Sequence, residues 1–143
     1  MKVYRIEHKD KKHPHSKHYR GPYYSKGVIH CYAFNSKFGK LDEDVAIDII
    51  DAMEHCLPTP SGDGLLIREG IDICGFTSLD MLLEWFPDAE GRSAMGVEKG
   101  FTLREYVVPC DAVNIGNYQC LFDRRKIAAS KELDITTLWV PDL

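Results

Sequence analysis

The chain has 143 residues, of which 44% are apolar and 28% are charged, proportions typical of one globular domain with its own core. No run of about 18 apolar residues occurs, which excludes a membrane-spanning helix, and we expect no signal peptide because the first residues lack an apolar stretch. The net charge of −4 divides into +8 over residues 1–40 and −12 over the remainder. This asymmetry favours a basic region that meets either an anionic partner or the acidic part of the same domain.

The first third of the chain predicts strands joined by a long basic loop. Over residues 2–8, Tyr4, Ile6 and His8 alternate with Val3, Arg5 and Glu7, a pattern typical of a strand with one mainly apolar face. Residues 9–25 have no apolar period and contain several turn formers, so we expect an exposed loop. Residues 27–34 form a second apolar segment, followed by a turn-rich connection over 35–40.

The middle of the chain predicts helices. Residues 42–56 carry apolar positions at helical spacing with acidic residues on the other side, and Pro58 ends this pattern. Residues 65–67 and 71–74 are short apolar runs, either of which can be a strand. Thr77, with Asp80 three residues later, resembles a capping box and predicts a helix over 79–86; residues 88–100 predict another helical segment.

The last third of the chain predicts sheet. Residues 101–108, 111–115 and 118–123 are rich in strand formers, and Gly116-Asn117 predicts a two-residue hairpin between the last two. Residues 135–140 add a further apolar segment. We therefore expect an α+β fold forming a single domain over residues 1–143, mostly antiparallel sheet with two or three short helices.

The five cysteines are an odd number and include no Cys-x-x-Cys pair, which disfavours a disulfide framework or zinc ribbon. We expect free, buried thiols and hence a reducing, cytoplasmic location. Histidines gather early in the chain, but their spacing matches no zinc pattern and lysines lie between them, so a solvated basic loop is favoured and no metal is expected. These histidines are His8, His13, His15 and His18.

The loop over 9–25 is the first candidate interface, because it combines cations with tyrosine rings. Cations bind phosphates or carboxylates and aromatic rings stack on bases, so either a nucleic acid or a protein can be its partner. The acidic net charge lacks the footprint of a dedicated nucleic-acid binder, which favours a protein partner. The candidate partner-binding residues are Lys11, Lys12, Lys17, Tyr19, Arg20, Tyr23 and Tyr24.

A dispersed pattern gives the second candidate site. Tyr4-Arg5, Phe76-Thr77-Ser78 and Glu105-Tyr-Val-Val-Pro occur in an order that resembles the Arg, Ser and Glu layout of ADP-ribosyltransferase-like domains. The resemblance implies NAD as cofactor, with Arg5 on its phosphates, Thr77 or Ser78 near the nicotinamide ribose, and Glu105 as the catalytic carboxylate that stabilises an oxocarbenium-like centre. Leu103 departs from that family, which carries a second acid or Gln there.

Each of these residues also has a structural interpretation. Arg5 can pair with Glu7 on the surface of a strand, Thr77 or Ser78 can cap a helix, and Glu105 can be a solvated residue of a half-buried strand. The chain also resembles small proteins of phages and mobile elements, through Gly-Pro-Tyr and the segment Gly-Phe-x-Ser-Leu-x-x-Leu-x-x-Trp-Phe. That resemblance implies a non-enzymatic inhibitor or protein-binding module that blocks a host enzyme or defence complex.

Overall fold

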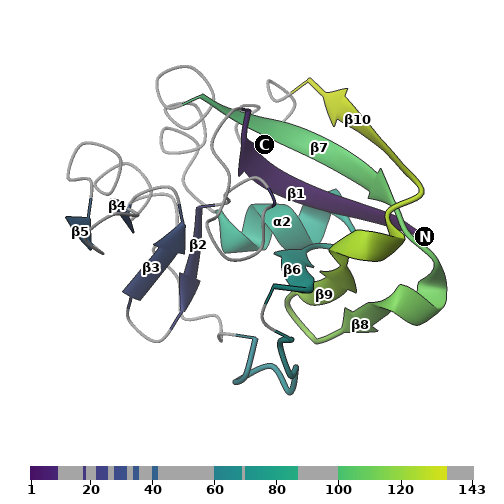
Figure 1. Ribbon diagram of the computed structural model, residues 1–143, viewed down its shortest axis with the longest axis horizontal. Helices are drawn as coiled ribbons and strands as arrows, with labels where there is room; N and C mark the ends of the chain where they lie inside the picture. Colours follow the sequence, from purple (N-terminus) through teal and green to yellow (C-terminus); the bar gives the residue numbers. More distant parts are fainter. Residues whose placement is uncertain are drawn as a thin grey trace.

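The structure is a computed structural model (Figure 1) that describes residues 1–9, 18, 60–68, 70–86 and 100–134, together with the backbone of short strands between residues 22 and 41. The described part is mostly antiparallel sheet with one α-helix, in agreement with an α+β class. The helices expected over 42–56 and 88–100, and the apolar segment over 135–140, lie outside the described residues. Within the described ranges, no helix is both long enough and apolar enough to cross a bilayer.

The first sheet has the order β1-β7-β10, with β1 at Lys2–His8, β7 at Phe101–Val107 and β10 at Ala129–Leu133. All neighbours in it are antiparallel, and Tyr4 lies opposite Glu105 while Arg5 lies opposite Arg104. Directly opposed residues share a face, and neighbouring residues of one strand point to opposite faces. The strands expected over 2–8 and 101–108 are confirmed, whereas β10 was not expected.

The second sheet has the order β6-β9-β8, with β6 at Asp72–Gly75, β9 at Cys120–Asp123 and β8 at Val113–Ile115. The strand expected from residue 111 starts later, because Cys110–Ala112 forms the 3-10 helix η1; a second 3-10 helix, η2, spans Arg124–Lys126. The expected two-residue turn at Gly116-Asn117 lies one residue later: the Gly116 N–H donates to the Gln119 carbonyl at 2.8 Å, which leaves Asn117 and Tyr118 between them. Residues 65–67 form no strand.

Four short strands complete the described backbone. β2 (Pro22–Ser25) pairs with β3 (Val28–Cys31), and β4 (Phe34–Asn35) pairs with β5 (Lys40–Leu41). Residues 22–25 were expected at the end of the exposed loop, so the loop interpretation is wrong for those four residues. Tyr23 and Tyr24 have high strand propensity, and pairing with the apolar β3 satisfies backbone groups that a loop would leave to water.

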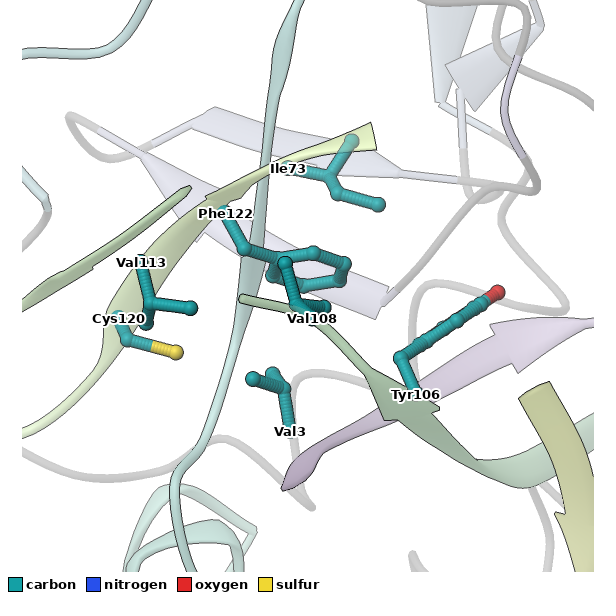
Figure 2. Packing of buried hydrophobic residues seen from close by; sticks show 7 residues of the cluster. All are labelled: Val3, Ile73, Tyr106, Val108, Val113, Cys120 and Phe122. Carbon is teal, nitrogen blue, oxygen red and sulfur yellow. The ribbon is translucent and has the colours of Figure 1, made fainter. Parts of the chain in front are cut away.

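The two three-stranded sheets meet where β1 passes the end of β6. Backbone bonds join Tyr4 and Phe76 in both directions, at 2.7 and 2.8 Å. Gly75 allows this approach, because a Cβ there would lie 2.6 Å from Val3 Cγ1. The apolar core between the sheets, shown in Figure 2, draws residues from both of them. They are Val3, Ile73, Tyr106, Val108, Val113, Cys120 and Phe122.

Helix α2 (Leu79–Trp85) buries Leu82 and Trp85 and packs beside β1 (Figure 1). The Phe76 ring lies 5.8 Å from that of Trp85 and 6.4 Å from that of Phe86, measured between centroids. This aromatic group holds α2 against the strand junction, since rings of this size bury large apolar areas. The helix expected over 79–86 is confirmed.

Candidate functional site: the Glu7 cluster

Among the described residues, one group of buried, hydrogen-bonded charges is centred on Glu7, and we call it the Glu7 cluster. It comprises Arg5 and Glu7 of β1, Arg104 and Tyr106 of β7, and His18. The four strand residues share one face of the β1-β7 pair, as the register requires, and this face turns toward the second sheet because Arg5 Nη1 donates to the Cys74 carbonyl at 2.7 Å.

The Glu7 carboxylate is the centre of this cluster, and its side chain is only 1% exposed. Its Oε2 lies 3.2 Å from Arg5 Nε and 3.3 Å from His18 Nε2. Its Oε1 accepts from the Tyr106 hydroxyl at 2.5 Å and lies 3.2 Å from Arg104 Nε. Each carboxylate oxygen therefore faces two polar groups, which is the kind of pairing that a buried charge requires.

These neighbours set the protonation of the cluster. Burial raises the pKa of Glu7, but the hydrogen bond from His18, the charge of Arg5 and the bond from Tyr106 outweigh it, so the pKa lies below its ordinary value of 4.5. Burial and the adjacent Glu7 charge raise the pKa of Tyr106. At neutral pH the carboxylate is thus ionised and the phenol is a donor.

The cluster joins three parts of the chain. The Tyr106 ring packs on Phe122 of the core and on the His18 ring, both at a centroid distance of 5.5 Å, while His18 Nε2 lies 2.8 Å from the Tyr106 hydroxyl. Since Glu7 is inaccessible, the cluster's chemistry is suited to anchoring rather than to catalysis. What it anchors is His18, a residue in the middle of the basic segment expected over 9–25.

The first and third residues of the expected ADP-ribosyltransferase layout do not come together. Arg5 and Glu105 are opposite Arg104 and Tyr4 respectively, so they point to opposite faces of the same strand pair. Arg5 does pair with Glu7, as the structural interpretation held, but it is buried and not on the surface.

Glu105 is also buried rather than solvated. Its Oε1 lies 3.8 Å from Lys2 Nζ and 3.7 Å from Lys131 Nζ, cations from the two flanking strands. The carboxylate is therefore neutralised by its own sheet. Burial, and then the Glu105 charge, raises the pKa of the neighbouring Tyr4.

Thr77 and Ser78 lie at the start of α2 and serve the helix. Ser78 is the N-cap, with its Oγ accepting from the Met81 N–H at 3.2 Å. The Thr77 hydroxyl donates instead to the Met81 sulfur, at 3.2 Å. The capping residue is thus one position later than the expected Thr77, because Ser78 has the extended backbone (φ −147°, ψ 158°) that an N-cap needs.

Most of the basic segment lies outside the described residues, including Lys11, Lys12, Lys17, Tyr19 and Arg20. Tyr23 and Tyr24 are described only as backbone of β2. Of the four histidines near the start of the chain, His13 and His15 lie outside the described residues. His8 packs on Phe101, on the face of β1 opposite to Glu7, and is therefore not near His18. Over the ranges that the structure describes, no group of three His, Cys, Asp or Glu side chains is arranged to hold a metal.

Among the described cysteines, Cys74, Cys110 and Cys120 are free thiols, of which Cys120 is buried and Cys110 exposed. Burial raises the pKa of Cys74 to about 11 and that of Cys120 to about 12. Both are therefore neutral thiols in the physiological range and poor nucleophiles. The side chains of Cys31 and Cys56 lie outside the described residues.

A second polar group, which the sequence did not indicate, lies at the end of the second sheet. Asp72 and Asp123 face each other across β6 and β9; Arg68 binds Asp72, Arg125 binds Asp123, and Arg68 also lies within ion-pair distance of Asp123. The side-chain hydrogen bonds of Arg125 hold the pKa of Asp123 below its ordinary value. Two acidic residues in separate strands carry no sequence signal until the register brings them together.

Residues 1–136 match the family described as Bacteriophage T4 Y00F protein. No curated protein and no solved structure matches the chain. Since the family match covers nearly the whole length, the chain belongs to the bacteriophage T4 Y00F protein family.

Proposed function

We propose that this phage protein is a non-enzymatic binding module that blocks a host protein through the basic segment over 9–25. The observation that carries the proposal is the attachment of His18 to the Glu7 cluster. A binding segment loses less entropy on association when part of it is already fixed. His18 stands next to Lys17 and Tyr19 in the chain, and both are candidate contact residues.

ADP-ribosyl transfer with NAD has less support. A dinucleotide bound by Arg5 would have to displace Glu7 and the Cys74 carbonyl from its guanidinium. Glu105, on the opposite face, could not reach a ribose held there. A nucleic acid is likewise a weaker candidate partner than a protein, because the net charge of the chain is negative.

The test is cross-linking of purified, tagged protein to a bacterial extract, with identification of the linked partner by mass spectrometry. We expect the variant Lys11→Gln, Lys12→Gln, Lys17→Gln, Arg20→Gln to lose the partner, and Glu105→Gln to retain it. Capture by the wild type should also weaken as salt rises, because exposed charges are screened. The control Lys131→Gln removes a charge outside the segment, leaves Lys2 on Glu105, and should retain the partner.

The same proteins are incubated with NAD, and released nicotinamide is measured. No release is expected from any of them. Nicotinamide release that Glu105→Gln abolishes would replace the binding proposal with the enzymatic one. Undiminished capture by the quadruple variant would also overturn the proposal, because the segment would then not be the contact.

A further inference from the structure

The two arginines of the second polar group are held in fixed positions by buried acids; we call Arg68 and Arg125 the arginine pair. Arg68 binds Asp72 through Nε at 3.0 Å and Nη2 at 2.9 Å, and Arg125 binds Asp123 through the same atoms at 3.0 and 2.9 Å. Arg68 Nη2 also lies 3.5 Å from Asp123 Oδ2. The two guanidinium groups therefore meet at one carboxylate and lie side by side.

The acids are hidden while the arginines face solvent. The side chains of Asp72 and Asp123 are 1% and 5% exposed, whereas those of Arg68 and Arg125 are 51% and 52% exposed. Within the described part of the chain, these hydrogen bonds use Nε and Nη2 of each arginine and leave Nη1 without a hydrogen-bond partner. The surface thus presents the Nη1 groups of two oriented guanidinium ions, while the aspartates that bind their Nε and Nη2 atoms are buried.

Exposed apolar side chains adjoin the pair in the sequence. Leu66 is 86% exposed and Ile67 is 51% exposed, which are high values for such large aliphatic residues. Two further cations, Arg124 and Lys126, flank Arg125 in η2. The surface therefore combines positive charge with aliphatic contact area.

We infer that Leu66, Ile67, Arg68 and Arg125 form a docking surface for an acidic segment of a protein that carries an aliphatic side chain between carboxylates. The Nη1 groups can donate charge-assisted hydrogen bonds to a partner's carboxylates, and the buried acids have already fixed the orientation of both guanidinium groups. An aliphatic residue on the partner would cover Leu66 and Ile67. A nucleic acid fits less well, because its bases stack on aromatic rings and this surface presents aliphatic ones.

This inference rests on the proposed function as a protein-binding module, but it concerns a different surface and is tested without the host partner. The probe is the peptide acetyl-Glu-Glu-Leu-Glu-Glu-amide, titrated into isotopically labelled full-length protein and followed by NMR. We expect saturable shifts at the Nε–H groups of Arg68 and Arg125 and at the methyl groups of Leu66 and Ile67. Replacing the peptide's leucine by serine should weaken binding roughly fivefold.

Variants are chosen so that no acid is left buried without its partner. Arg68→Gln with Asp72→Asn removes one charge pair as a unit, and Leu66→Ser with Ile67→Ser changes only exposed side chains. Each is expected to weaken peptide binding roughly fivefold to tenfold with the fold intact by circular dichroism. The control Lys131→Gln leaves Lys2 on Glu105 and should bind as the wild type does.

Three results would overturn the inference: shifts that do not saturate, shifts confined to other residues, or tighter binding of an oligothymidylate than of the peptide. The quadruple variant of the basic segment separates the two proposals. It should still bind the peptide even though it loses the host partner. If it loses the peptide while Leu66→Ser with Ile67→Ser keeps it, the docking surface is wrong and the basic segment is the acidic-peptide site.

Discussion

Replacing Glu7 by glutamine should destabilise the protein strongly. Glutamine keeps the shape of the side chain but turns one acceptor oxygen into an NH₂ donor. Oε1 is bound by Tyr106 and Arg104, and Oε2 by Arg5 and His18, so the new amide opposes a guanidinium in either orientation. Leaving a buried charge without its partner costs about 3–5 kcal/mol. For a chain of this length, that corresponds to a fall in Tm of about 10–15 °C.

The assay is thermal and urea unfolding followed by circular dichroism, and Glu132→Gln is the matched control. The Glu132 side chain is 52% exposed and lies on the same face of the sheet as Glu7, 3.7 Å from Lys9 Nζ. Exposed ion pairs contribute under about 1 kcal/mol, so the control should lie close to the wild type. Equal free energies of unfolding for the two variants would refute the reasoning that Glu7 organises a buried network.

The pH dependence gives an independent check on the same residue. Because the pKa of Glu7 is lowered by folding, the unfolded state binds more protons in the pH range just below 4.5. The stabilisation from Glu7 is therefore complete above that range and is lost as the pH falls through the lower folded pKa. The difference in the free energy of unfolding between wild type and Glu7→Gln should become smaller as the pH falls. A difference that stays constant down to pH 2.5, about two units below the ordinary pKa of 4.5, would contradict the lowered pKa of Glu7.

Further outcomes concern the loops and the helix. Gly116→Ala should displace Asp63, since a Cβ would overlap its carboxylate, and destabilise by about 1–3 kcal/mol; this cost should disappear when Gly116→Ala is introduced into Asp63→Ala. Ser78→Ala should cost about 1 kcal/mol by chemical unfolding through loss of the N-cap bond, and an unchanged stability would argue against capping. Ellman's reagent should modify Cys110 well before Cys120 in the native protein, and equal rates would be inconsistent with burial of Cys120.

The elements with local signals were predictable from the sequence. Strand formers at alternating positions identify β1 and β7, and the polar residues before Leu79 identify the start of α2. β10 was missed because Ala129–Leu133 has little strand propensity and is mostly exposed. It forms a strand because it pairs with β7, which is distant in the sequence.

The candidate site was harder to predict for a related reason. The alternation in β1 suggests that Arg5 and Glu7 face solvent, and only the second sheet and His18 convert that face into an interior. The order of Arg5 and Glu105 in the sequence likewise does not show whether the two side chains lie on the same face of the sheet, because that depends on the register of β1 and β7. Charge clusters assembled across strands are properties of the pairing rather than of any one segment.

β7 lies between β1 and β10, and this sheet order also determines when each strand can pair during synthesis. Apart from the two bonds between Tyr4 and Phe76, β1 finds its backbone partners almost a hundred residues later, so Lys2–His8 of a nascent chain cannot complete its pairing until Phe101–Val107 has left the ribosome. At bacterial elongation rates this interval is roughly 5–20 s. β1 is therefore the first strand to be synthesised but among the last to complete its pairing. Until then its charged residues favour its solubility.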